Sequence, residues 1–396
     1  MGFILIAGLL LAGSSVRGLL STTIVQILAL ALLPLLVDWS RPNGLWKSVN
    51  LLLFCAVLLP AFQLLPVHLL AGSGVAGSLP QSIALTLSLE RTAESLLFVA
   101  PCALLFLVLS RFSENDFNRV LPFLYLGFLA NIVFGLVQFA ARSSDGLSPG
   151  FLPYEARAGF FANPNHFATL MFVAIPLVIY QFQAIRRPAL SLAAVAVILV
   201  ASFATRSVAG VFLSMGCALF SYAAIVRMPP VWRAVLVIVG LAGMLGLALN
   251  PGNVLEIRAD DPLDRTSIWA NTVQAIIRYL PFGTGLGTFD LIYPSVEAGS
   301  DIRTSFINHA HNEYLELLLE GGAVMAVLLI GYFSALLVAM WRLPPTPLRL
   351  ASFCALAFVL LHSGVEYPLR NLSMALVFTL LNAIVFSTNP KAARRA

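Results

Sequence analysis

The sequence predicts an all-α fold, a polytopic integral membrane helical bundle with about twelve transmembrane helices. Of the 396 residues, 59% are hydrophobic and only 10% are charged, and the mean hydropathy is +0.92. Soluble domains carry about 25% charged residues. Apolar runs recur along nearly the whole chain, and backbone in lipid must satisfy its own hydrogen bonds, so we expect these runs to be helices. We interpret residues 1–396 as a single membrane domain.

The apolar runs give the expected spans in order. The first run lacks a basic leader and a small-residue cleavage site, and a second run follows at once, so we expect a short first span and not a cleaved signal peptide. The expected spans are 2–14, 19–38, 47–62, 92–110, 119–140, 165–184, 190–204, 208–226, 231–249, 313–341, 347–364 and 371–388.

The charged residues predict the orientation of the spans. More than half of the 23 Lys and Arg fall on the side that holds both chain ends, and most of the 18 Asp and Glu fall on the other side. An excess of basic residues marks the cytoplasmic side of a membrane protein, so both termini are expected to be cytoplasmic. The formal charge of +5 is explained by this topology, and no nucleic-acid partner is expected.

The long polar segments all fall on the outer face, and the largest is the loop 250–311 between spans nine and ten. Within it, Asp264 is expected to cap a helix that begins at Arg265. Residues 283–287, Gly-Thr-Gly-Leu-Gly, are expected to form a flexible turn. They lack the strand-turn-helix context of a nucleotide site, so no dinucleotide binding is expected. Four residues at helical spacing would give the loop helix an apolar face toward the membrane surface or the bundle: Trp269, Val273, Ile276 and Leu280.

The stretch 308–316 is the strongest candidate for chemistry. It brings His309, His311 and several carboxylates to the start of an apolar span, where ionisable groups are costly and therefore indicate function. Histidine suits a general base near neutral pH. Asn312 and Glu316 share a helix face four residues apart. A His-x-His pair with carboxylates also suits zinc, but no further ligands follow at a recognisable spacing, and we predict no metal site.

The arginines of the outer face are candidates for binding an anion. The only two lysines are expected to be cytoplasmic, so every outer basic residue is arginine, which binds phosphate oxygens bidentately. A compositional preference for arginine is the alternative. Arg206 lies in a tight outer turn, where it either binds an anion or extends to the interface. Arg265 opens the loop helix, an end that disfavours a cation, and this mismatch indicates function.

The segment that leads into the sixth span has two interpretations. Asn163 as cap and Pro164 at the first helical position make an ordinary helix start. Alternatively, Arg157 and Asn165 are donors that line the same outer cavity as the arginines.

These motifs, in this order, resemble the O-antigen ligase superfamily, which includes bacterial glycan polymerases and protein O-oligosaccharyltransferases. The resemblance extends from about residue 150 to 325, and the first four and last two spans match only in hydropathy. The matching pieces are 157–167, 205–207, Asp264 and Arg265 with Trp269, 281–289 and 309–322.

The resemblance implies a metal-independent, inverting glycosyltransferase without a cofactor, in the bacterial inner membrane, with its active site facing the periplasm. It would serve cell-surface polysaccharide or lipopolysaccharide assembly. The donor would be an oligosaccharide on a polyprenyl pyrophosphate, such as undecaprenyl pyrophosphate, and the acceptor a glycan, lipid A-core or protein. His311 resembles the catalytic base, and Arg206 and Arg265 the pyrophosphate-binding residues, with Arg157 a weaker match. The possible supporting residues are Asn165, His309, Asn312 and Glu316.

Other functions remain open at this point. A polymerase of exopolysaccharide or O-antigen repeat units would share all these motifs. A lipid-linked glycan flippase is a rival from another class, but a transporter is expected to place polar groups near the bilayer midplane and on both faces. A non-catalytic glycan-binding subunit is a third alternative, and it would tolerate the loss of His311.

Overall fold

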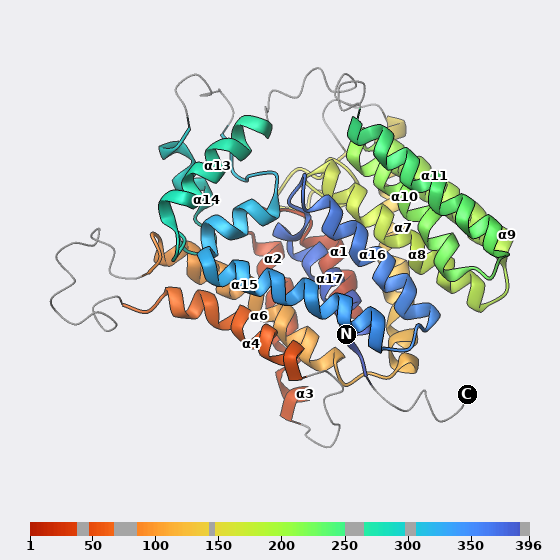
Figure 1. Ribbon diagram of the computed structural model, residues 1–396, viewed down its shortest axis with the longest axis horizontal. Helices are drawn as coiled ribbons and strands as arrows, with labels where there is room; N and C mark the ends of the chain where they lie inside the picture. Colours follow the sequence, from red (N-terminus) through yellow and green to blue (C-terminus); the bar gives the residue numbers. More distant parts are fainter. Residues whose placement is uncertain (38–46, 67–84, 142–146, 250–264, 298–305, 389–396) are drawn as a thin grey trace.

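The chain is built from helices. We describe a computed structural model in residues 1–37, 47–66, 85–141, 147–249, 265–297 and 306–388, and this part contains no β-strand (Figure 1). The all-α prediction is therefore confirmed. In chain order the helices are α1 Gly2–Leu11, α2 Leu20–Leu30, α3 Leu33–Val37, α4 Lys47–Gln63, α6 Leu89–Leu109, α7 Glu114–Ala141, α8 Pro164–Ala184, α9 Pro188–Ala204, α10 Val208–Ile225, α11 Pro230–Leu249, α13 Arg265–Tyr279, α14 Phe289–Ile292, the 3₁₀ helix η2 Tyr293–Ser295, α15 Glu313–Arg342, α16 Pro347–His362, the 3₁₀ helix η3 Pro368–Arg370 and α17 Leu372–Phe386.

Every expected span coincides with an apolar helix. Within the described residues, five helices are long and apolar enough to cross a membrane, namely α6, α7, α8, α10 and α15. Shorter apolar helices occupy the other expected spans, and the span expected at 19–38 is divided between α2 and α3. The chain is thus a helical membrane protein, and the count of twelve spans, the single domain and the periplasmic loop 250–311 stay predictions.

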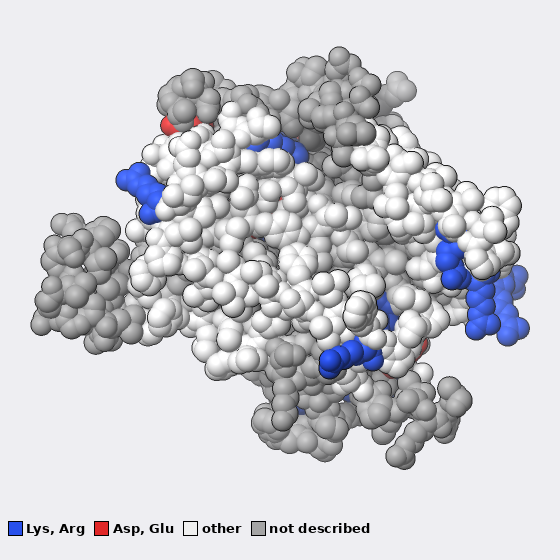
Figure 2. Space-filling view, viewed as in Figure 1, with Lys and Arg blue, Asp and Glu red and all other residues white. Residues whose placement is uncertain are grey.

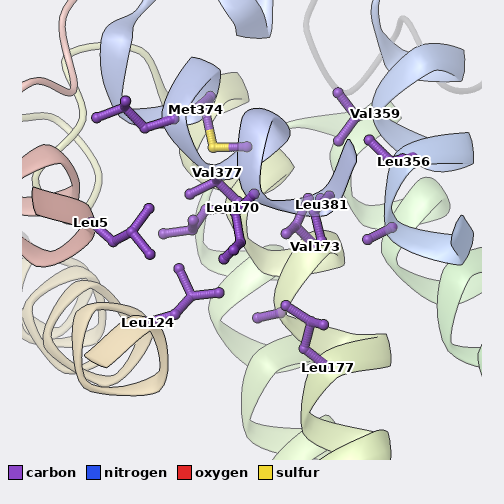
Figure 3. Packing of buried hydrophobic residues seen from close by; sticks show 14 of the residues in the cluster. Leu5, Leu124, Leu170, Val173, Leu177, Leu356, Val359, Met374, Val377 and Leu381 are labelled. Atoms are coloured by element: carbon purple, nitrogen blue, oxygen red, sulfur yellow. The ribbon is translucent and has the colours of Figure 1, made fainter. Parts of the chain in front are cut away.

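The core is centred on α8, which is apolar on all sides and has 72% of its most apolar 18-residue stretch buried. A helix of this kind belongs inside a bundle. Figure 3 shows Leu170, Val173 and Leu177 of α8 packed against leucines of α1, α7, α16 and α17. This core holds the first turn of α8 in a fixed position at one end of the bundle.

The outer surface of the bundle is apolar, as lipid-facing helices require. Ile27, Leu97, Ile238 and Val327 are each at least 60% exposed. Figure 2 shows a face that is almost free of charge, with Lys and Arg near its edges. Burial of polar backbone inside the helices makes such a surface stable in hydrocarbon.

Helix α15 is not one continuous span, because it breaks at Gly322. This residue has φ 57° and ψ −146°, outside the helical region, and the helix changes direction there (Figure 1). The carboxylates Glu313, Glu316 and Glu320 all lie in the short segment before the break. The expected span at 313–341 coincides with α15, and the break, which the sequence did not predict, separates its polar turns from its apolar ones.

The turn at 283–287 fills this break. Gly285 N donates to Glu320 O at 2.9 Å, and Ala323 N donates to Pro281 O at 2.8 Å, so backbone groups freed by the break find partners. The three glycines of the turn have φ between 78° and 101°. The expected turn is therefore present, as a packed element that supports α15, and its flexibility stays a prediction.

Gly322→Ala is expected to destabilise the fold on the order of 3 kcal/mol, because it adds backbone strain and overpacking. A Cβ at this position would lie 2.3 Å from Pro281 O, and the positive φ disfavours any side chain. The thermal midpoint of the detergent-solubilised protein measures the effect. Gly243→Ala is the matched control, because nothing lies within 4 Å of its Cβ and its midpoint should not fall.

Helix α13 begins at Arg265 as expected, but a different face is buried. Ile268, Thr272 and Ala275 face inward against Phe289 and its neighbours. Val273 and Leu280, which the sequence placed on the apolar face, are 41% and 50% exposed. Two adjacent apolar stripes run along this helix. Small side chains on the inner stripe let the helix pack closely against its neighbours, and the spacing of apolar residues alone does not reveal which stripe is buried. Asp264 lies outside the described residues.

Candidate active site

Several helix starts meet at one end of the bundle. Asn163 caps α8, Asn312 caps α15 and Asn371 caps α17, each through its side-chain oxygen. Helix α13 begins in the same place at Arg265, which contacts the link between α16 and α17. Helix N-termini carry partial positive charge, so this end of the bundle favours anions.

Glu366, in the link between α16 and α17, contacts residues from several of the sequence motifs. Its Oε1 accepts hydrogen bonds from Asn165 Nδ2 at 2.5 Å and Arg265 Nη2 at 2.8 Å. The same oxygen lies 3.1 Å from His311 Nδ1. Three residues separated by up to 146 positions in sequence thus share one carboxylate oxygen, and the side chain of Glu366 is only 1% exposed.

The carboxylate of Glu366 is held in its ionised form. Burial alone would raise its pKa, but the neighbouring His311, the hydrogen bond from it, and the charges of Arg265 and His166 together lower the pKa below its ordinary value. Arg265 also donates through Nη1 to Val365 O at 2.7 Å, so two hydrogen bonds hold the guanidinium beside Glu366. The ion pair explains why an arginine opens α13 against the helix dipole.

The geometry of His311 suits a general base. With Glu366 as an acceptor at Nδ1, this nitrogen carries the proton, and Nε2 is left with its lone pair. Nε2 makes no hydrogen bond with any residue in the described ranges. His311 has φ 50°, an uncommon conformation for a non-glycine residue that is concentrated at functional sites.

A second histidine and carboxylate pair lies beside the first. His309 Nδ1 is 2.9 Å from Glu316 Oε1, and Glu316 Oε2 accepts from Ala310 N at 2.9 Å. Arg370 lies behind the pair, with Nη2 at 3.4 Å from Glu316 Oε1 and Nη1 at 3.0 Å from Glu320 Oε2. Glu316, one of the expected supporting residues, therefore fixes the turn that carries both histidines.

Tyr367 separates the two pairs. Its ring stacks on His309 with centroids 4.2 Å apart and meets His311 edge-on at 4.9 Å. Its hydroxyl accepts a hydrogen bond from Asn163 Nδ2 at 3.3 Å. Burial, with the charge of Glu366 beside it, raises the pKa of Tyr367, so the ring stays a neutral spacer between the histidines.

The structure brings Asn165, Arg265, His309, His311 and Glu316 together, with Asn312 as the cap that follows His311. Trp269 supports the group, since its Nε1 donates to Ala310 O at 3.0 Å. The structure thus brings these residues together, and their role in an outer site stays a prediction.

No contact within the described residues joins the other two expected arginines to this group. Arg206 has φ 53° in the turn between α9 and α10, is exposed, and forms no ion pair with a residue in the described part of the chain. Its turn lies against α8, because Gly210 is packed on Ala168. Arg157 is 64% exposed and pairs with Glu155 at 3.3 Å, so the structure does not bring it to the histidines.

Replacement of Arg265 by lysine should be nearly as damaging as replacement by alanine. The guanidinium holds Val365 O and Glu366 Oε1 through two nitrogens at once, and an ammonium cannot reproduce that fork. We expect Arg265→Lys to lower the catalytic rate by at least about tenfold, since a charged hydrogen bond is worth roughly 1.5–3 kcal/mol. Arg278→Lys, on an exposed stretch of the same helix, is the control. A fully active Arg265→Lys protein would show that charge alone suffices.

Sequence reasoning missed Glu366 and Tyr367, and it counted Arg370 only among the outer arginines, without a specific role. All three lie between two spans that carry none of the recognised motifs. One signal was present: Glu366 is an isolated acid between apolar runs, and such an acid indicates function by its cost.

A cavity of about 380 Å³ adjoins the site. It is bounded by the α1–α2 connection, α2, α6, the first segment of α15 and η3. His309, Glu313 and Arg370 line the end nearest the histidines. In the described ranges, no three His, Cys, Asp or Glu side chains are placed to hold a metal ion.

Residues 166–330 match the family model described as O-antigen ligase. The matched region begins in the first turn of α8 and ends in α15, so it contains Arg206, Arg265, His309 and His311. Glu366 lies beyond it. No curated protein matches the chain.

Proposed function

We propose that this chain, which belongs to the O-antigen ligase and polymerase superfamily, transfers a glycan from a polyprenyl-pyrophosphate carrier to an acceptor hydroxyl in bacterial glycan assembly. The observation that carries the proposal is the pairing of His311 with Glu366, a carboxylate also bound by Arg265 and Asn165. The family and the apolar helices indicate a bacterial integral membrane protein. We place its active site on the periplasmic face.

His311 acts as the general base in this proposal. Its Nε2 takes the proton of the acceptor hydroxyl as the oxygen attacks the anomeric carbon of the donor. Glu366 holds the imidazole in the required tautomer and stabilises the imidazolium that forms, as the aspartate does in hydrolase triads. A positioned base contributes typically about 10²–10⁴-fold to a rate.

The arginines act on the leaving group. The bond between the anomeric carbon and the phosphate oxygen breaks, and polyprenyl pyrophosphate departs with the bonding electrons. Arg265 keeps donors beyond the two that are bound to Val365 and Glu366, and Arg206 is exposed beside α8. Charge stabilisation in a poorly hydrated site supplies several kcal/mol. Attack from the face opposite the leaving group inverts the anomeric centre.

No metal is required by this mechanism, because arginine supplies the positive charge. Transfer is therefore expected to continue at an unchanged rate in excess EDTA. A rate that falls in EDTA and returns with a divalent cation would contradict this part of the proposal.

The test is a reaction of purified full-length protein with a polyprenyl-pyrophosphate oligosaccharide. Lipid A-core and a second lipid-linked oligosaccharide are offered separately as acceptors, and products are identified by mass. Transfer to lipid A-core makes the protein a ligase, and joining of two repeat units makes it a polymerase. Tight donor binding with no transfer to either, or to an acceptor protein, would contradict the proposal and favour transport or binding.

A further inference from the structure

We infer that the cavity of about 380 Å³ beside His309 binds a neutral sugar of the acceptor, with His309 as the residue that hydrogen-bonds it. The inference rests on the proposed function and adds the place and chemistry of the second substrate. The volume lies within the range of about 300–1,000 Å³ of small-molecule sites.

An unpartnered hydroxyl points to a ligand in this cavity. Thr22 Oγ1 belongs to a residue that lines it, is buried, and forms no hydrogen bond within the described ranges. The charged side chains of the lining are already ion-paired, since Glu94 Oε2 lies 3.8 Å from Arg17 Nη1 and Arg370 Nη2 lies 3.4 Å from Glu316 Oε1. Buried polar atoms normally have partners, so the orphan hydroxyl of Thr22 indicates a molecule that supplies one.

The chemistry of this atom selects hydroxyl groups. The orphan hydroxyl of Thr22 both donates and accepts, and a ligand rich in hydroxyls matches it. Serines 14, 15 and 95 add further hydroxyls to the lining. A sugar ring has this pattern of donors and acceptors.

The charges of the cavity disfavour the pyrophosphate of the donor. Arg370 is already paired with Glu316 and Glu320, and Arg17 donates to Gly287 O at 2.6 Å and lies beside Glu94. Glu313 adds another carboxylate to the lining. A dianionic group entering here would meet carboxylates whose arginines are occupied, which costs free energy.

His309 connects the cavity to the chemistry. Its Nδ1 is held by Glu316, so Nε2 is the nitrogen available to a ligand, and no hydrogen bond to Nε2 is formed within the described ranges. His309 and His311 contact the same Tyr367 ring from different directions. His311 does not line the cavity, so in this inference a glycan anchored at His309 reaches past the Tyr367 ring to place its reacting hydroxyl at the base.

The experiment measures KM for each substrate separately, with whichever acceptor supports transfer, lipid A-core or a second lipid-linked oligosaccharide. Thr22→Val keeps the shape and removes the orphan hydroxyl, and we expect it to raise the acceptor KM about tenfold, the value of one hydrogen bond. Thr22→Phe fills the cavity and should raise it further. Neither should change the donor KM.

Ser21→Ala is the matched control, because Ser21 Oγ is also a buried orphan on α2 but does not line the cavity. It should leave both KM values unchanged. Slow hydrolysis of the donor without acceptor reports on folding and donor binding, and it should be equal in all these proteins.

His309→Gln tests the anchoring residue. It should raise the acceptor KM at least tenfold while donor hydrolysis persists. An increase in donor KM in the Thr22 variants, or unchanged acceptor KM in all of them, would overturn the inference. Failure of the proposed function is distinguishable, because wild-type protein would then transfer to no acceptor.

Discussion

His311→Ala is expected to lower the rate of glycan transfer by about 10²–10⁴-fold, the usual contribution of a general base. The loss follows from removal of the imidazole whose Nδ1 is fixed by Glu366 and whose Nε2 receives the acceptor proton in our account. The measurement is the initial rate of product formation by purified protein in detergent, with donor and acceptor both saturating.

Unfolding of the variant would also lower the rate, so the thermal midpoint is measured together with the rate. The imidazole is small and partly accessible, with 11% of its side chain exposed, and its removal should leave the midpoint within a few degrees of wild type. Substantial transfer by a folded His311→Ala protein would eliminate His311 as the base.

Glu366→Gln is expected to be nearly as damaging, at about 10²–10³-fold, although Gln has almost the same shape. The amide cannot stabilise an imidazolium, and its NH₂ group competes with the donors that now converge on Oε1 from Asn165, Arg265 and His311. Because Glu366 acts through His311, the effect should fall on kcat more than on the acceptor KM.

Glu366→Asp distinguishes positioning from structural support. It restores the charge on a shorter side chain, and we expect it to recover part of the rate that Gln loses. Equal activity of the Asp and Gln variants at equal thermal stability would show that the carboxylate charge has no role in the reaction.

The lowered pKa of Glu366 also predicts how stability depends on pH. Its pKa in the folded protein is below the unfolded value of about 4.3, so its contribution is fully present above that pH. The contribution is lost progressively as pH falls below about 4.3 toward the folded pKa. Thermal midpoints of wild type and Glu366→Gln should therefore converge in acid, and a constant difference would contradict the assignment.

The helices and the order of the motifs were predictable because both are local. Apolar runs mark α6, α7 and α8 to within a few residues, and Asn163 with Pro164 marks a helix start that the structure confirms. The stretch at His309 and His311 was recognised because ionisable groups beside an apolar helix are unusual.

What could not be predicted depends on tertiary contacts. Glu366 lies far along the chain from Asn165 and becomes a partner only when α8 packs against α16. The break at Gly322 depends on the turn at residues 283–287, which is distant in sequence and packs against it. Arg157 lay in a matching motif, yet its side chain pairs with Glu155 at the surface, because adjacency in sequence does not fix where a side chain points.

The central claim, a single displacement with His311 as base, is tested most directly by the anomeric configuration of the product. Purified protein is given a polyprenyl-pyrophosphate oligosaccharide of known configuration and its acceptor, and the new linkage is analysed by NMR. The account predicts an inverted centre in every product molecule. A retained configuration would require a covalent or double-displacement route and would contradict it.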